Sequence, residues 1–148
     1  MLAENPRRIA ALTAGVAPAR LREPTNDRWS ATDVLAHLRS CADVWGDYIA
    51  VMLVEDRPTL RGRDPRTWIK RTNYPELELR SSLRSFAKQR ADLLAVLEPL
   101  PPTAWLRGAT VRGGGSAHET TVHDYAQLLA RHEQTHLKQI ARIVEVVR

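Results

Sequence analysis

The chain has 148 residues, of which 43% are hydrophobic, and its net charge is +5 with the histidines neutral. This length suits one domain with a single core, and no stretch approaches the roughly 18 apolar residues of a membrane span. The one cysteine, Cys41, excludes an internal disulfide, which agrees with a reducing compartment. We therefore expect a single cytoplasmic domain over residues 1–148, without a membrane segment.

The first twenty residues imitate a secretory signal, because two arginines precede an apolar stretch and small residues follow at 17–19. The large apolar residues of this stretch are Ile9, Leu12 and Val16, whose spacing of three and four is that of an amphipathic helix. The spacing favours a short first helix over a signal peptide.

A second helix is predicted to begin at Ser30, because Asp33 follows at the spacing of a capping box. It is expected to run to about Glu55 and to end before Pro58. His37 lies among its apolar positions, near its start. A single histidine on an apolar face is more often a hydrogen-bonded core residue than a metal ligand. The role of His37 therefore depends on which residues of the other helices lie opposite it.

Residues 57–71 are strongly basic and contain Arg57, Arg61, Arg63, Arg66, Lys70 and Arg71. Trp68 and Tyr74 are interleaved with them, and two prolines interrupt regular structure. The favoured interpretation is a long, solvated crossover loop whose aromatic residues anchor it to the bundle. Two alternatives are a nucleic-acid surface, which uses basic and aromatic residues together, and a contact between one or two arginines and an anionic small substrate.

A third helix is predicted to begin at Pro75 and to end before Pro99. The prolines and glycines of residues 99–120 predict an irregular connection, with a short helical turn at 103–106. A fourth helix then begins at Thr121, which has Asp124 three residues later as its capping partner. His118 and His123 lie in or beside the connection, and they are expected to be surface groups or to lie behind the ligands of a site.

The fourth helix carries His132 and His136, which lie one turn apart on the same face. Both belong to an apolar stripe made of Tyr125, Leu129, His132, His136, Ile140, Ile143 and Val147. An imidazole in a core must find partners for both ring nitrogens, so two adjacent rings indicate a shared metal ion or a hydrogen-bond network. Opposite this pair, His37 becomes a candidate third ligand.

Residues 132–136 also match the H-E-x-x-H signature of zinc peptidases. Those enzymes take their third ligand from further along the chain, but here few residues follow His136. Gln139 and Arg142 stand where the extended motif needs glycine and histidine. The sequence therefore disfavours a peptidase.

Two motifs resemble the DinB/YfiT-like family. Residues 29–38, Trp-Ser-Ala-Thr-Asp-Val-Leu-Ala-His-Leu, are similar to a helix start in that family. Residues 121–140, in which Leu-Lys-Gln-Ile follows the histidine pair, are similar to its C-terminal signature. The resemblance implies an all-α four-helix bundle with up-down-down-up topology, a long crossover loop between helices 2 and 3, and a homodimer.

The resemblance also implies a three-histidine site in which His37, His132 and His136 bind one divalent metal ion. Three neutral imidazoles leave the ion its full charge and an open position, so it can turn water or a thiol into a nucleophile. Zinc is the expected metal, with nickel, iron or manganese as alternatives. Glu133 projects about 100° away from His132 around the helix. It is a candidate for orienting a group behind the ligands, or for a general base if the site lies beside that face.

The leading hypothesis is therefore a metal-dependent transferase or hydrolase. Some members of the family are enzymes that act with low-molecular-weight thiols, and such a cosubstrate is expected here, with a small, anionic substrate. The first alternative is a metal-binding bundle without catalysis. The second, which is disfavoured, is a nucleic-acid binder that acts through residues 57–71.

Overall fold

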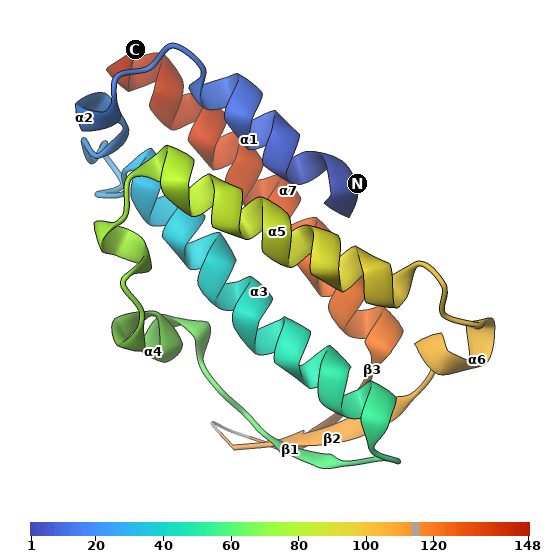
Figure 1. Cartoon of the computed structure of the whole chain (residues 1–148). Helices are drawn as coiled ribbons and strands as arrows, with labels where there is room; N and C mark the ends of the chain where they lie inside the picture. The colour runs from blue at the N-terminus through green and yellow to red at the C-terminus, as the bar shows by residue number, and fades with distance from the viewer. Residues whose placement is uncertain (114–115) are drawn as a thin grey trace.

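The computed structural model describes residues 1–113 and 116–148. Within these residues the bundle has four main helices, which are α1 (Asn5–Thr13), α3 (Ala31–Val54), α5 (Leu79–Leu97) and α7 (Val122–Val147). Each of them packs against two others, in the ring order α3, α7, α1 and α5 (Figure 1). The rings of His37 and Tyr48 on α3 lie against those of His132 and Tyr125 on α7, so these two helices are antiparallel.

The two central helices begin at capping boxes, as the sequence predicts. Ser30 Oγ accepts a hydrogen bond from the Asp33 amide, and Asp33 Oδ2 accepts one from the Ser30 amide, both at 3.0 Å. Thr121 and Asp124 make the same reciprocal bonds at the start of α7. Because a cap fixes the first residue of a helix, it also fixes which residues of that helix face the core.

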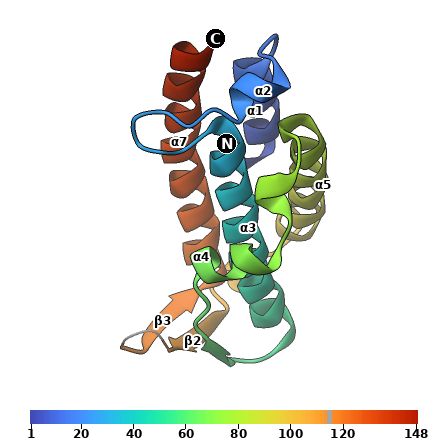
Figure 2. The ribbon, with the colours of Figure 1, turned by 90° about the vertical axis from the view of Figure 1, so that its left-hand side faces the viewer.

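A small sheet closes one end of the bundle, below the helices in Figure 2. Its described strands are β1 (Thr59–Arg61), β2 (Gly108–Arg112) and β3 (His118–Thr121), in the order β1-β2-β3. β1 is parallel to β2, with Leu60 beside Val111, and β2 is antiparallel to β3. Leu60, Ala109 and Val111 are buried against the bundle. The sheet corrects the all-α prediction, in which residues 99–120 were expected to be irregular.

Short helical segments complete the described chain: η1 (Leu2–Glu4), α2 (Pro18–Leu21), α4 (Pro65–Trp68), η2 (Ile69–Arg71), η3 (Tyr74–Glu76) and α6 (Pro102–Trp105). The third main helix begins at Leu79 and not at Pro75, because Glu78 is extended and Pro75 belongs to the separate turn η3. α1 buries Ile9 completely, in agreement with a short first helix. No helix among the described residues is both long and apolar enough to cross a membrane.

Aromatic residues anchor the basic crossover to the bundle. The carboxylate of Asp43, on α3, accepts hydrogen bonds from Trp68 Nε1 at 3.1 Å and from the Tyr74 hydroxyl at 2.6 Å. It also accepts one from Gln89 Nε2 of α5 at 2.6 Å, and the guanidinium of Arg39 lies 3.7 Å from the Tyr74 ring centroid. These contacts support the interpretation of residues 57–71 as an anchored crossover, although β1, α4 and η2 give it more regular structure than a loop.

Candidate metal centre

Three imidazoles converge between α3 and α7. His37 Nε2 lies 3.0 Å from His132 Nε2, and His136 Nε2 lies 3.1 Å from the same atom. The ring centroids of His37 and His136 are 4.8 Å apart. The structure thus brings together all three histidines that the sequence analysis singled out, with the Nε2 atoms of His37 and His136 both beside that of His132.

A thiol lies beside the same point. Cys41 follows His37 by one turn of α3, and its Sγ is 3.7 Å from His37 Nε2 and 3.8 Å from His132 Nε2. The ligand atoms of His37, Cys41 and His132 all lie within 4.8 Å of one another, so these three residues can hold a metal ion. The sequence analysis used Cys41 only to exclude a disulfide and missed it as a candidate ligand. Its spacing of four from His37 was the available signal.

The environment keeps two of the imidazoles neutral. Burial lowers the pKa of His37 to about 4, with the charges of His136 and Arg66 acting in the same direction. Burial likewise lowers the pKa of His132 to about 3, assisted by His136 and His37. Burial, followed by the charge of Glu133, raises the pKa of the Cys41 thiol to about 12. At neutral pH the cluster therefore offers unprotonated imidazole nitrogens together with a protonated thiol.

Hydrogen bonding shows that the cluster fits a divalent cation. His136 Nδ1 donates to Gln139 Oε1 at 2.7 Å, which leaves the lone pair of its Nε2 directed at the cluster. Gln139 is itself held by Asp27 Oδ2 at 3.0 Å. His132 Nδ1 is buried and has no hydrogen-bond partner among the described residues. His132 Nε2 can donate to one neighbouring ring at most, whereas a cation would satisfy all three Nε2 lone pairs.

Comparison with known proteins identifies the family of the chain. The family model of the DinB superfamily matches residues 1–140. The chain belongs to the DinB superfamily. No curated protein matches its sequence.

A solved structure shows the shared fold. It is YfiT from Bacillus subtilis, which is described as a probable metal-dependent hydrolase with an unusual four-helix bundle topology. The two structures match with a TM-score of 0.79 over 97% of this chain and 82% of that one, at 20% sequence identity. At this identity the likeness concerns the fold of this DinB-superfamily chain and not its activity.

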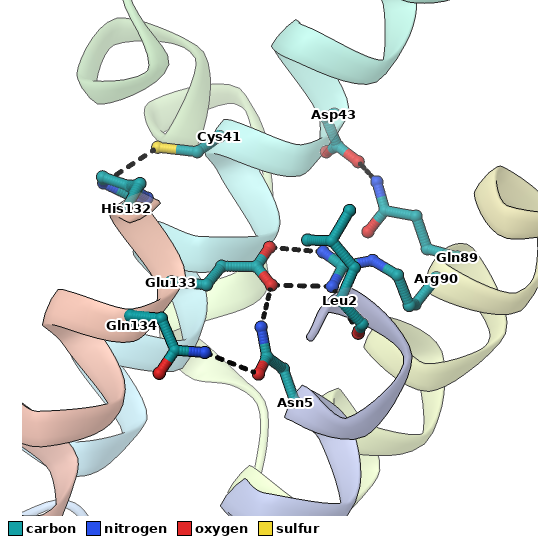
Figure 3. A network of polar contacts seen from close by, with 9 residues as sticks. All are labelled: Leu2, Asn5, Cys41, Asp43, Gln89, Arg90, His132, Glu133 and Gln134. Carbon is teal, nitrogen blue, oxygen red and sulfur yellow. Dashed lines mark hydrogen bonds and ion pairs between the residues drawn. The ribbon is translucent and has the colours of Figure 1, made fainter. Parts of the chain in front are cut away.

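Glu133 points away from the cluster, towards Arg90 and Asn5 (Figure 3). Its carboxylate is 1% exposed and accepts hydrogen bonds from Arg90, on α5, and from Asn5 Nδ2 at 2.8 Å. A carboxylate bound by a guanidinium and an amide has few lone pairs left to accept a further proton. In this DinB-superfamily bundle, Glu133 therefore links α7 to α1 and α5, and it is not placed to act as a general base.

The remaining two histidines do not join the cluster. His118 is exposed on β3. His123 is exposed near the start of α7, where its ring lies edge-on to Trp105 at a centroid distance of 6.4 Å. His118 and His123 of this DinB-superfamily chain therefore lie outside the cluster of His37, His132 and His136, as the sequence analysis expected.

A cavity of about 770 Å³ lies near the cluster. Trp45 connects the two, because it lines the cavity while its ring lies edge-on to the His132 ring at a centroid distance of 5.0 Å. Tyr48 and Tyr125 also line the cavity. In this DinB-superfamily chain, a small molecule in the cavity would lie against Trp45, which in turn lies against the His132 ring.

Proposed function

We propose that the protein is a divalent-metal-dependent enzyme that activates water or a thiol for hydrolysis of, or transfer to, a small substrate. The observation that carries this proposal is the convergence of His37, His132 and His136 through their Nε2 atoms. Zinc is the expected ion, and imidazole ligands also suit nickel and iron. A low-molecular-weight thiol is the proposed cosubstrate of the transfer reaction.

When bound, a divalent cation supplies Lewis-acid chemistry that generates a nucleophile near neutral pH. The chain's own residues prepare the site for it. Burial keeps His37 and His132 unprotonated, so that their Nε2 lone pairs are available. Gln139 fixes the tautomer of His136 by accepting from Nδ1. Trp29 and Trp45 lie edge-on to the His37 and His132 rings and pack against them.

A non-catalytic metal-binding protein is the second candidate, and Cys41 is the observation that favours it. Three histidines and a cysteine would complete a tetrahedral coordination sphere, as in structural zinc sites. Three histidines alone would leave one position open, as in catalytic sites. The two candidates therefore differ in whether the Cys41 thiol binds the ion.

The first test is the metal content of protein purified without added metal, measured by elemental mass spectrometry. We expect near-stoichiometric metal in the native protein and its loss in the His132→Ala, His136→Ala double variant. The matched control is the His118→Ala, His123→Ala double variant, which removes two histidines outside the cluster and should keep its metal. Absence of metal from the native protein, even after incubation with zinc, nickel or iron, would overturn the proposal.

A further inference from the structure

The cavity beside the metal centre combines an apolar wall with charged groups. Its apolar lining includes Trp45, Val111 and Leu128, and its polar lining includes two arginines, Arg63 and Arg131. Its lining comes from α3, α7 and the strands β2 and β3, so it lies where these two helices meet the sheet. Ligand pockets of similar volume are mostly apolar with a few polar groups that fix the orientation of the ligand.

Most charged groups of the lining already have an ion-pair or hydrogen-bond partner within the protein. Arg63 Nη1 forms an ion pair with Asp47 at 2.9 Å. Asp64 is the N-cap of α4 and accepts from the Arg66 amide at 2.9 Å, and Asp124 is the capping-box partner of Thr121 and accepts from its amide at 3.0 Å.

Arg131 differs from these groups. It is exposed and donates only to the neutral Gln127 Oε1, at 3.1 Å, and no carboxylate in the described part of the chain forms an ion pair with it. Arg131 is therefore the cationic group of the lining whose charge is not compensated by the protein.

Arg131 is also the arginine of the lining that is next to a candidate ligand in the sequence. It directly precedes His132 on α7, and Trp45 lies against the His132 ring from the opposite helix. A molecule with its anionic group on Arg131 and its flat part against Trp45 would be held beside the three imidazoles. A guanidinium binds a carboxylate through two parallel hydrogen bonds, which fixes the orientation as well as the charge.

We infer that this cavity binds the substrate, and that the substrate is a small carboxylic acid with a planar or apolar body. Arg131 holds the carboxylate, and Trp45 and Leu128 contact the body. A single negative charge suits one uncompensated arginine, whereas the nearby carboxylates of Asp64 and Asp124 would repel a phosphate dianion. The role as a substrate site rests on the proposed metal-dependent function, but the binding of the acid does not.

The test uses four probes that share a ring and differ in charge: benzoate, benzamide, benzylammonium and phenyl phosphate. Their affinities for the full chain are measured by protein-observed NMR, with the Trp45 indole resonance identified by its loss in Trp45→Phe. We expect benzoate to bind most tightly and to shift that resonance. Arg131→Gln should weaken benzoate about tenfold and leave benzamide unchanged. Arg142→Gln removes an exposed arginine of the same helix outside the cavity, and it should leave the affinities for all four probes unchanged.

Three outcomes would overturn the inference. They are no binding of benzoate at millimolar concentration, tighter binding of benzylammonium or phenyl phosphate than of benzoate, or an equal loss of benzoate affinity in Arg131→Gln and Arg142→Gln. The measurements are made on both metal-free and metal-loaded protein. If the protein binds no metal but binds benzoate through Arg131, the proposed function fails and the acid site remains. If metal binds to the histidines but benzoate does not bind, only the acid site fails.

Discussion

Arg90 and Glu133 form a buried ion pair one residue beyond the candidate ligand His132. The side chain of Arg90 is 3% exposed and that of Glu133 is 1% exposed. Asn5 Nδ2 donates to the same carboxylate at 2.8 Å, and Arg90 Nη1 donates to the Leu2 carbonyl at 3.0 Å. The pair therefore joins α5, α7 and the N-terminal segment next to the metal centre.

Removal of one partner should be costly, because it leaves the other charge buried without compensation. We expect Arg90→Met to lower the free energy of unfolding by about 3–5 kcal/mol. The double variant Arg90→Met, Glu133→Leu should be less destabilised than Arg90→Met alone, since it removes both charges. Urea denaturation followed by circular dichroism measures these differences.

The control for the buried pair is an exposed one. Lys88 and Asp92 form an ion pair at 3.0 Å on the surface of α5, with side chains 79% and 68% exposed. Lys88→Ala should change the free energy of unfolding by less than about 1 kcal/mol. If Arg90→Met lowered the free energy of unfolding no more than Lys88→Ala, the buried pair would not stabilise the bundle.

Tyr74 should make the protein sensitive to alkaline pH. Burial, followed by the hydrogen bond to Asp43, raises the pKa of Tyr74 to about 12. In the unfolded chain the phenol ionises near its ordinary pKa of about 10, so the stability due to this group is present below pH 10 and is lost as the pH rises toward 12. Ultraviolet difference titration of the native protein against Tyr74→Phe isolates this phenol. Asp43→Asn should move its pKa back toward the ordinary value, and an unchanged titration in that variant would contradict the stated role of Asp43.

The starts of α3 and α7 could be predicted from the sequence because capping is local, whereas the start of α5, which has no side-chain cap, was placed four residues too early. Ser30 with Asp33, and Thr121 with Asp124, carry their signal within four residues. The sheet could not be predicted, because Thr59 pairs with Thr110 across some fifty residues of chain and β1 buries only Leu60. β3 likewise buries one residue, and the alternation of β2 extends only over Ala109 and Val111, which is too short to stand out as a period of two.

The site was predictable to the extent that its signals lie on single helices. His132 and His136 stand out because two imidazoles interrupt one apolar stripe. Cys41 was not recognised, since a cysteine among apolar residues is indistinguishable from a core position. Arg90 was also missed, because an arginine in an amphipathic helix is typical of a surface and its partner Glu133 lies on another helix.

Metal binding should stabilise the native protein through the three histidines. Ligand binding to the folded state alone adds about 2.7 kcal/mol at a free concentration of 100 times the dissociation constant. We expect a chelator to lower the melting temperature of the native protein and added zinc to restore it. His37→Ala should remove most of this response, whereas His123→Ala should retain it. A response of the same size in His37→Ala, measured by scanning calorimetry, would exclude His37 as a ligand.

Cobalt substitution decides whether Cys41 belongs to the coordination sphere. The proposed enzyme needs an open position, so we expect Cys41→Ser to bind Co²⁺ with nearly the native affinity, and the native Co²⁺ protein to lack an intense near-ultraviolet band from a thiolate. The opposite result is equally informative: a thiolate band that disappears in Cys41→Ser would show that three histidines and a cysteine close the site. The metal would then stabilise the bundle, and the cavity beside Trp45 would have no open coordination position to serve.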